Sequence, residues 1–458
     1  MKITAAAPLS PRLFLMTFGL LAALLAFSLP AWGDERPVEQ MRYLDNSVVK
    51  VGVDLALGGS ITFLSRDGGE NIINNYDLGR QVQLSFYSGP IPYTENGKQP
   101  SEHWKHLGWN PIQAGDDWKH GSKVLDYQND GHRLYVKCVP LQWPLDNVPG
   151  ECTFETWLEL DGPVVMGKGR LNNLRHDQTQ YAAREQELPA VYANAPFYRV
   201  VSYTGSQPFM GREISEIPKS QTKHPWTRWV GTEGWAALLD PSNHGLGLIT
   251  PGHVDFTGGF AGKPGPNDTH GVGTGYLAGQ AREILDHHIQ YDFVFELLAG
   301  NLEEIRARAT KWKPDGLPRW TFEKDRQGWH YLHAKDQGWP IHDELHVIME
   351  EPDPQMLSPL CFWQADDAPY VVIEAAYHTT KKNGTIYWQR HGDSAPMPDA
   401  AVNFPIQADG EFHHYVVKLK DAAHYQGPMV LLRFDPIPDG GPGDWVKVKS
   451  VRLSKNAE

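Results

Sequence analysis

The chain has 458 residues, a formal net charge of −13 at pH 7, 44 glycines, 35 prolines and 3 cysteines. The acidic balance argues against nucleic acid and anionic membrane surfaces as partners, because both repel a negatively charged protein. The length is sufficient for two domains with sizeable cores. The cysteines show no spacing typical of a zinc site, and we expect no metal and no cofactor.

Residues 1–33 have the pattern of a cleavable secretory signal peptide. Two basic residues precede an apolar run over 13–29, and Ala31 and Gly33 provide the small side chains of a cleavage site. The run is at the short end for spanning a bilayer and an acidic residue follows the cleavage site, which favours cleavage over a retained membrane anchor. We therefore expect a secreted or periplasmic protein without a membrane segment after cleavage.

The chain that follows reads as a succession of β-strands. Apolar and polar residues alternate over 49–55, 154–160 and 289–297, and glycines and prolines interrupt these runs at short intervals. This pattern is typical of antiparallel sandwiches rather than of alternating strands and helices. Cys138 and Cys152 flank a predicted hairpin loop, and in an exported protein this spacing allows a disulfide.

The segment 104–118 combines tryptophans with amides and acids. Sugar rings present apolar C–H faces and a rim of hydroxyls, so a carbohydrate site needs aromatic platforms beside amide and carboxylate groups. The candidates of this kind are Trp104, Trp109, Asn110, Gln113, Asp116 and Asp117, the two aspartates also being candidate catalytic carboxylates. The alternatives are that the tryptophans close the end of the sandwich while the acids cap turns, or that the aspartates hold a structural Ca²⁺ ion.

The densest cluster of chargeable side chains lies in 175–192. Glu185 and Glu187 are two positions apart, so they point to the same face of a strand. This spacing is close for an acid and a nucleophile on one segment, so we expect only one of these two glutamates to be catalytic. We choose Glu187. His176 is a second candidate acid or base, and Arg184 a candidate for binding a substrate acid or lowering a neighbouring pKa. The alternative is a solvated loop with structural ion pairs.

Further aromatic residues are candidates for the walls of a cleft. Trp226 and Trp229 are interpreted as a second wall and Tyr192 as an additional platform for a sugar ring. Trp235 precedes an apolar run and is expected in the core. A glycine-rich turn over 271–275 lacks a strand–helix context, so it does not indicate a dinucleotide site.

One helix is predicted, and it separates two parts of the chain. Asn301 and Glu304 form the pattern of a capping box at its start. We place a domain boundary after it, which gives a domain over 34–316 and a smaller one over 317–458 whose short strands suggest a jelly roll. In the last strand the apolar positions change parity, which predicts a β-bulge near residues 449–450.

Two sets of stretches carry a family likeness: 49–61, 244–252 and 295–306 in the first part, and 387–389, 404–415 and 432–436 in the second. The first part resembles the galactose-mutarotase-like supersandwich of aldose epimerases and of several glycoside hydrolases and polysaccharide lyases. The second is similar to jelly-roll modules attached to carbohydrate-active proteins. The resemblance implies an all-β chain, with a large antiparallel supersandwich, one linking helix and a smaller jelly-roll sandwich. The His acid and Glu base of aldose epimerases have no residue-by-residue match, so no role is transferred.

These features lead us to expect a secreted carbohydrate-active enzyme. The first hypothesis is a glycoside hydrolase acting on a poly- or oligosaccharide, with Glu187 as acid or base and one of the two aspartates as its partner across a cleft. The second is a polysaccharide lyase, with Tyr192 or His176 as base and Arg184 neutralising a uronate. The third is a non-catalytic periplasmic glycan-binding protein.

Overall fold

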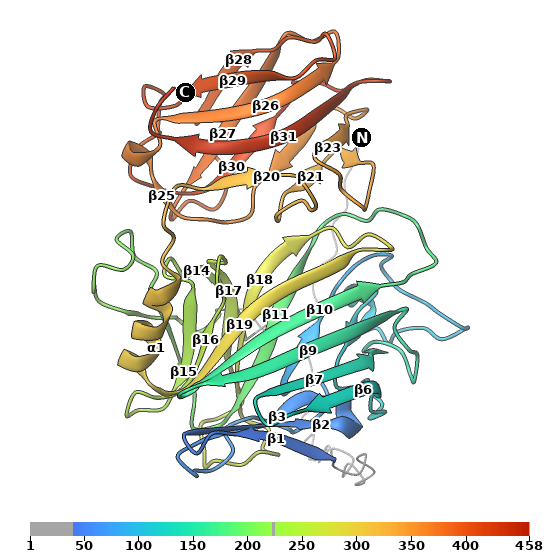
Figure 1. Cartoon of the computed structure of the whole chain (residues 1–458), viewed down its shortest axis with the longest axis vertical. Helices are drawn as coiled ribbons and strands as arrows, with labels where there is room; N and C mark the ends of the chain where they lie inside the picture. The colour runs from blue at the N-terminus through green and yellow to red at the C-terminus, as the bar shows by residue number, and fades with distance from the viewer. Residues whose placement is uncertain (1–39, 222–224, 458) are drawn as a thin grey trace, which may run out of the picture. The chain divides into compact units, whose positions relative to one another are not determined.

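The computed structural model describes residues 40–221 and 225–457. Over these residues the chain forms four antiparallel sheets, one α-helix, α1 (Leu302–Ala309), and a few short 3₁₀ turns (Figure 1). The predicted all-β class is therefore confirmed. The predicted signal peptide lies outside the described residues. Among the helices in the described part of the chain, none has the length and apolarity needed to cross a bilayer.

Two large sheets, built from β1 to β19, form what we call the N-terminal sandwich. The first sheet has the strand order β1-β2-β3-β4-β11-β18-β17-β14, with β5 and β8 attached beside β4. Its strands are β1 Met41–Asp45, β2 Val49–Asp54, β3 Ser60–Arg66, β4 Val82–Ser85, β5 Pro111–Ile112, β8 Leu141–Gln142, β11 Arg184–Asn194, β14 Trp226–Val230, β17 Asp255–Ala261 and β18 Thr274–Glu283.

The second sheet has the order β13-β12-β15-β16-β19-β10-β9-β7-β6. Its strands are β6 Lys123–Asn129, β7 Arg133–Val139, β9 Cys152–Asp161, β10 Val164–Asn173, β12 Arg199–Ser202, β13 Ser215–Glu216, β15 Trp235–Leu239, β16 His244–Ile249 and β19 Gln290–Asn301.

The period-two alternation predicted from the sequence places the core between these two sheets. Side chains of β9 alternate between buried and half-buried positions along most of the strand. Phe86, beyond the end of β4, packs edge-on against Phe154 of β9 with 5.3 Å between ring centroids, so aromatic rings from both sheets meet in one core. Trp235 is fully buried, as expected.

Two further sheets, built from β20 to β31, form what we call the C-terminal sandwich. Their orders are β22-β23-β31-β26-β29 with β20 beside β31, and β21-β24-β30-β27-β28 with β25 beside β30. The strands are β20 Arg319–Thr321, β21 His330–Leu332, β22 Lys335–Asp336, β23 Leu345–Ile348, β24 Gln355–Leu357, β25 Trp363–Gln364, β26 Tyr370–His378, β27 Asn383–Arg390, β28 Ala401–Pro405, β29 His413–Lys418, β30 Pro428–Asp435 and β31 Trp445–Ser454.

Two local predictions are confirmed by the backbone. In β31, Ser450 pairs with Glu374 and Val448 with Ala375, so Lys449 is the extra residue of a β-bulge. At the start of α1, the Asn301 side chain accepts from the Glu304 backbone N–H while the Glu304 carboxylate accepts from the Asn301 N–H, which is a complete capping box.

Cys138 and Cys152 are buried, free thiols in the structure. Cys138 pairs across the strands with Phe154 and not with Cys152. Burial raises the pKa of Cys138 to about 12, so this thiol is not a reactive nucleophile. The disulfide that the sequence spacing allows is not formed.

The two sandwiches belong to one compact unit, Arg36–Glu458. Within it, the guanidinium of Arg326 lies between Asp286 of the N-terminal sandwich and Asp336 of the C-terminal sandwich, with N–O distances of 2.6 Å to both. The predicted boundary at residues 316–317 falls between α1 and β20, but independent domains at this boundary stay a prediction.

Candidate functional site

A strip of aromatic and acidic side chains lies on the face of the first sheet that points away from the core. It consists of Tyr87, Glu187, Tyr192, Trp226 and Tyr276, and we call it the Glu187 strip. Strand β11 supplies its centre, paired with β4 on one side and β18 on the other.

A β-bulge in β11 creates this arrangement. Glu187 pairs with Gln280 and Ala190 pairs with Ala278, so β11 carries one more residue than β18 over this stretch. In a regular strand Glu187 and Tyr192 would point to opposite faces, because they are separated by an odd number of positions. The extra residue resets the parity, and both side chains lie on the outer face.

The carboxylate of Glu187 is held by two phenols. The hydroxyl of Tyr87 donates to Oε2 of Glu187 at 3.0 Å, and the hydroxyl of Tyr276 donates a short hydrogen bond to Oε1. Burial raises the pKa of Glu187, although hydrogen bonds from Tyr276, Ser85 and Tyr87 offset part of this rise. Glu187 therefore has the properties of a general acid that keeps its proton at a higher pH than an ordinary carboxyl group.

Two further aromatic rings pack against Tyr276. The rings of Tyr192 and Trp226 each lie with their centroids 4.8 Å from that of Tyr276. Burial, together with the charge of Glu187, raises the pKa of Tyr276 and Tyr192 well above the ordinary tyrosine value. Both phenols thus remain protonated at neutral pH, and that of Tyr276 donates its hydrogen bond to Glu187.

Charged groups continue the face on one side of the strip. Arg228 donates from Nε to Asp255 at 2.8 Å and from Nη1 to Glu185 at 3.1 Å. Burial alone would raise the pKa of Glu185, but the charges of Arg282 and Arg228 outweigh it and lower that pKa. Glu185 and Glu187 therefore share one strand face but have pKa values shifted in opposite directions.

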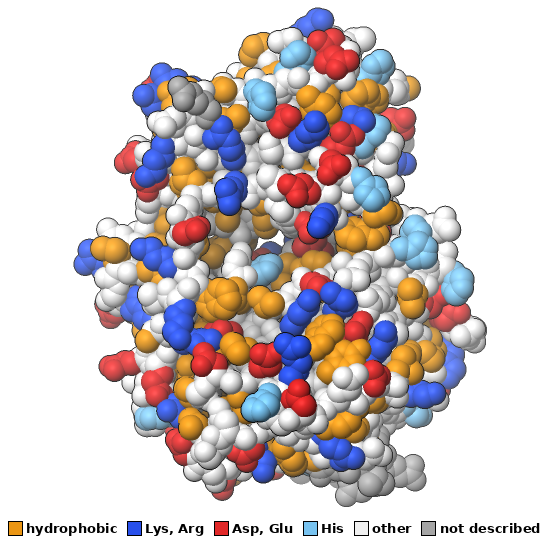
Figure 2. Space-filling model, viewed as in Figure 1, with side chains coloured by type: hydrophobic (Ala, Val, Ile, Leu, Met, Phe, Trp, Pro, Cys, Tyr) orange, Lys and Arg blue, Asp and Glu red, His pale blue; other side chains and the backbone are white. Residues whose placement is uncertain are grey.

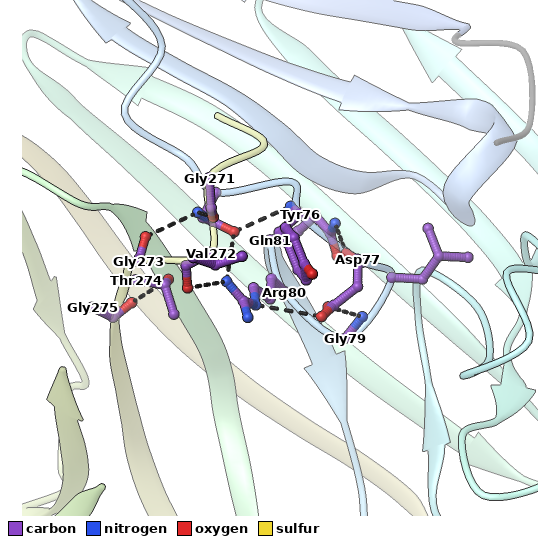
Figure 3. Close-up of polar contacts among 12 residues, drawn as sticks. Tyr76, Asp77, Gly79, Arg80, Gln81, Gly271, Val272, Gly273, Thr274 and Gly275 are labelled. Atoms are coloured by element: carbon purple, nitrogen blue, oxygen red, sulfur yellow. Dashed lines mark hydrogen bonds and ion pairs between the residues drawn. The ribbon is translucent and has the colours of Figure 1, made fainter. Parts of the chain in front are cut away.

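The connection between β3 and β4 is held to the glycine-rich turn over 271–275 by hydrogen bonds (Figure 3). Arg80 donates from Nη1 to the carbonyl oxygen of Val272 at 3.0 Å and forms an ion pair with Asp77 at 3.4 Å. The charges of Asp77 and Arg80 both act on the pKa of Tyr192, which places this ion pair close to the strip. The glycine-rich turn over 271–275 thus accepts hydrogen bonds with its carbonyl groups and anchors the edge of the site.

The structure does not bring the two aspartates of the 104–118 segment to Glu187. Asp116 is buried, and its Oδ1 accepts from the backbone N–H groups of Trp118 and His120, both at 2.9 Å. Asp117 accepts from the indole N–H of Trp104 at 2.7 Å. These are turn-capping and loop-stabilising contacts, and they offer neither carboxylate to a shared cleft.

The same segment supplies the one cluster of possible metal ligands within the described residues. Atoms of Asp116, His120 and Asp146 lie within 4.8 Å of one another. Oδ2 of Asp116 accepts from the backbone N–H of Asn147 at 2.7 Å and lies 2.8 Å from Nδ1 of His120. The cluster offers one ligand atom from each of three residues, one of them a histidine nitrogen, whereas a Ca²⁺ ion takes six to eight oxygen ligands.

The predicted aromatic and amide platforms of this segment are mostly structural. Trp109 is fully buried. Asn110 donates to the carbonyl oxygen of Phe86 at 2.9 Å, and Gln113 accepts from the backbone N–H of Leu84 at 3.1 Å. These side chains satisfy backbone groups inside the fold and are not presented to a ligand.

His176 lies apart from the Glu187 strip, whereas the guanidinium of Arg184 lies 5.6 Å from the centroid of the Tyr87 ring but is held by a backbone carbonyl. His176 is exposed, and its Nδ1 is 2.5 Å from Glu151, whose hydrogen bond and charge raise the pKa of the ring. Arg184 donates to the carbonyl oxygen of Leu107 at 2.6 Å and so connects β11 to the 104–118 segment. Neither makes a described contact with Glu187.

Of the two predicted wall tryptophans, only Trp226 lies in the strip. Trp229 stacks on Phe256 with 6.0 Å between centroids and packs against the core. The residues that sequence reasoning missed are Tyr87 and Tyr276. Tyr87 follows strand β4, and Tyr276 lies within β18. A single tyrosine at such a position carries no local signal that distinguishes it from a structural tyrosine.

Glu283, the last residue of β18, lies where this face meets a cavity lined by residues of both sandwiches. Burial raises its pKa from 4.5 to about 8, although the charge of Arg326 lowers it in part. Between these two pH values the folded protein keeps a proton that the unfolded chain has released, so this group lowers stability as the pH rises from 4.5 towards 8.

Substituting Glu283→Gln should therefore stabilise the protein more at pH 8.5 than at pH 5.5. The difference in the gain of unfolding free energy should be on the order of 3 kcal/mol. Urea unfolding of both proteins at the two pH values measures it, and an equal gain at both would contradict the raised pKa.

No family model matches the sequence, and no curated protein matches it. The solved structures to which the chain is similar include galactose mutarotase-like proteins. One from Lactobacillus casei is 12% identical over 57% of this chain and 99% of its own, with a TM-score of 0.35. A galactose mutarotase related enzyme from Lactobacillus acidophilus is 9% identical over 57% and 97%, with a TM-score of 0.37. An alpha-galactosidase from Lactobacillus brevis is 8% identical over 57% of this chain and 39% of its own, with a TM-score of 0.34. At values this low the matches assign neither residues nor an activity to this chain.

Proposed function

We propose that this chain is a secreted or periplasmic glycoside hydrolase that acts on a poly- or oligosaccharide, with Glu187 as its general acid. The observation that carries the proposal is the setting of Glu187: a carboxyl group of raised pKa, hydrogen-bonded by the phenols of Tyr87 and Tyr276, with the rings of Tyr192 and Trp226 packed against Tyr276. A sugar ring stacked on these aromatics would present its glycosidic oxygen to a protonated carboxyl group.

We propose Glu185 as the partner. This revises both the expectation that only one of these two glutamates is catalytic and the choice of an aspartate of the 104–118 segment as the second carboxylate. Opposite pKa shifts in two neighbouring carboxyl groups are typical of an acid and a base working together. Here the ion pairs of Glu185 with Arg228 and Arg282 keep it ionised. Carboxyl separations of roughly 5–5.5 Å and roughly 6.5–9.5 Å distinguish retaining from inverting glycosidases. The anomeric configuration of the product therefore tests how the two carboxyl groups act.

A lyase fits this setting less well. Removing a proton from a sugar carbon needs a base, and Tyr192, whose pKa is raised well above the ordinary value, remains a protonated phenol. Arg184, assigned to the uronate in that hypothesis, is already bound to the Leu107 carbonyl.

The test is a screen of the purified protein against neutral and acidic polysaccharides. New reducing ends are expected for a neutral substrate, and NMR of the product determines whether the anomeric configuration is inverted or retained. Products that absorb as unsaturated uronides would instead identify a lyase, and binding without any product would identify a glycan-binding protein. Either of these results would overturn the hydrolase proposal.

A further inference from the structure

A cavity of about 1110 Å³ lies between the N-terminal sandwich and loops of the C-terminal sandwich. On the face shown in Figure 2, the surface is hollowed there, with acidic, basic and hydrophobic side chains around the opening. Trp229, Trp320 and Trp339 are among its lining residues, so the walls include large aromatic surfaces. Of the aromatic platforms and catalytic carboxylates predicted from the sequence, only Trp229 belongs to it.

Two buried polar side chains point into this cavity without a partner. Gln280 is 7% exposed and lines the cavity, and its amide makes no hydrogen bond within the described part of the chain. His330 is 5% exposed and lines the cavity from the other sandwich. Its Nδ1 lies 3.2 Å from the carbonyl oxygen of Gly328, whereas Nε2 has no partner among the described residues. Neither residue has a polar side-chain atom that is both fully buried and unpaired, so the unpaired atoms are open to the cavity and can hydrogen-bond a ligand there.

The chemistry of these two groups is complementary to hydroxyls. Burial lowers the pKa of His330 to about 4, so its ring is neutral at pH 7. Since Nδ1 faces a carbonyl oxygen it must carry the ring proton, and Nε2 is therefore an acceptor. The amide of Gln280 can both donate and accept a hydrogen bond. A hydroxyl group can also do both, so it can pair with the Gln280 amide or donate to Nε2 of His330.

The charges that line the cavity largely cancel. Arg228 is paired with Asp255, Arg326 with Asp286, Asp292 with Lys168, and Asp393 with Arg390. The raised pKa of Glu283, about 8, keeps that carboxyl group neutral at pH 7. The site therefore carries little net charge with which to recognise an ionic ligand, and its aromatic walls favour a ligand with apolar faces.

The cavity continues the Glu187 strip. Gln280 is the cross-strand partner of Glu187, and Arg282 is the partner of Glu185. Both Gln280 and Arg282 line the cavity. The charges of Arg282, Glu185 and Arg228 also act on His330, which places this residue of the C-terminal sandwich close to the acidic pair.

We propose that this cavity binds uncharged sugar units of the glycan adjacent to the unit at Glu187, with Gln280 and His330 hydrogen-bonding their hydroxyls. The inference deepens the proposed function and rests on it for the placement of the glycan chain. It gives the C-terminal sandwich a direct part in substrate binding, as the far wall of the site, and it identifies the substrate class as a neutral glycan of several sugar units.

The test is calorimetric binding of neutral hexasaccharides to the full chain carrying Glu187→Gln, which prevents turnover. The probes are maltohexaose, cellohexaose, xylohexaose and mannohexaose, with hexagalacturonate as the acidic counterpart. At least one neutral hexasaccharide should bind. Gln280→Met and His330→Phe, which keep the side-chain volume and remove the polar groups, should each weaken that binding about tenfold.

Controls separate a local effect from loss of folding. Gln128→Met makes the same change on the exposed strand β6 and should leave the affinity unchanged. Ala395→Trp fills the cavity from an exposed loop position without removing a core side chain, and it should also weaken binding if His330→Phe fails to fold.

The proposal is overturned if no neutral hexasaccharide binds, if hexagalacturonate alone binds, or if the folded cavity variants bind as tightly as the parent. This experiment measures binding only, so its outcome is separate from the hydrolase assignment. If Glu187→Gln retained full turnover while the cavity variants lost affinity, the general acid would be reassigned and the cavity would stand as a glycan site.

Discussion

Glu187→Gln is expected to abolish turnover of the polysaccharide while leaving its binding within a factor of about two. The amide keeps the size of the carboxyl group and its contacts with Tyr87 and Tyr276, but it cannot deliver a proton to a leaving oxygen. Loss of the general acid should reduce kcat by roughly 10²–10⁴-fold. Steady-state kinetics by reducing-end release, paired with calorimetry, measures both effects.

The chain offers a closely matched control for this substitution. Glu155 on β9 also accepts from a phenol, that of Tyr135 at 2.8 Å, and also lies half-buried on a strand face. It belongs to the other sheet of the N-terminal sandwich, away from the strip. Glu155→Gln should therefore leave kcat unchanged, and an equal loss in both variants would show that such changes act through stability.

The pH dependence of kcat is an independent test of Glu187 as the general acid. A general acid works in its protonated form, so kcat should fall as the pH rises through the pKa of Glu187. Because burial raises that pKa, the fall should come at a higher pH than the ordinary value of a glutamate would give. Full activity in the Glu187→Gln variant, or a profile without this alkaline limb, would remove Glu187 from the mechanism.

The sequence was informative wherever the signal is local. The period-two alternation predicts the strands, the change of parity at Lys449 predicts the bulge, and Asn301 with Glu304 predicts the helix start. Each of these signals arises within a few residues, where backbone geometry alone relates side chains to one another.

The site depends on pairings between distant parts of the chain, and these leave no local signal. Tyr87 is 100 residues and Tyr276 is 89 residues from Glu187 in the sequence. Only the order of strands β4, β11 and β18 in the sheet brings them together. Composition led to a wrong prediction for the 104–118 segment. Tryptophan and aspartate residues give the same sequence pattern whether they line a cleft or are buried, and Trp109 and Asp116 are buried.

The largest expected effect on stability comes from Arg326, whose buried guanidinium joins the two sandwiches. It forms ion pairs at 2.6 Å with Asp286 and with Asp336, and all three side chains are at most 3% exposed. Arg326→Met would leave two buried carboxylates without their counter-charge, and removing one partner from a buried ion pair costs about 3–5 kcal/mol. Urea unfolding at pH 7 should show a loss of this size.

Two comparisons distinguish this mechanism from a loss of packing. Arg133→Met removes an exposed partner of Glu159 and should change stability by less than about 1 kcal/mol. Adding Asp286→Asn and Asp336→Asn to Arg326→Met should recover much of the loss, because neutral amides carry no uncompensated charge. If the triple variant were no more stable than Arg326→Met alone, buried charge would not be the cause.

The pH dependence of this deficit has a definite sign. Burial by itself would raise the pKa of Asp336, but its hydrogen bond and ion pair with Arg326 outweigh burial and lower that pKa. The pair therefore contributes stability above the ordinary aspartate pKa, and this contribution is lost as the pH falls through the depressed value. In Arg326→Met, Asp336 can take up a proton instead, so the deficit relative to the parent should shrink as the pH is lowered towards about 4. A deficit independent of pH would indicate that Arg326 acts through its aliphatic stem, whereas a deficit that shrinks would identify the buried charge as the group that joins the two sandwiches.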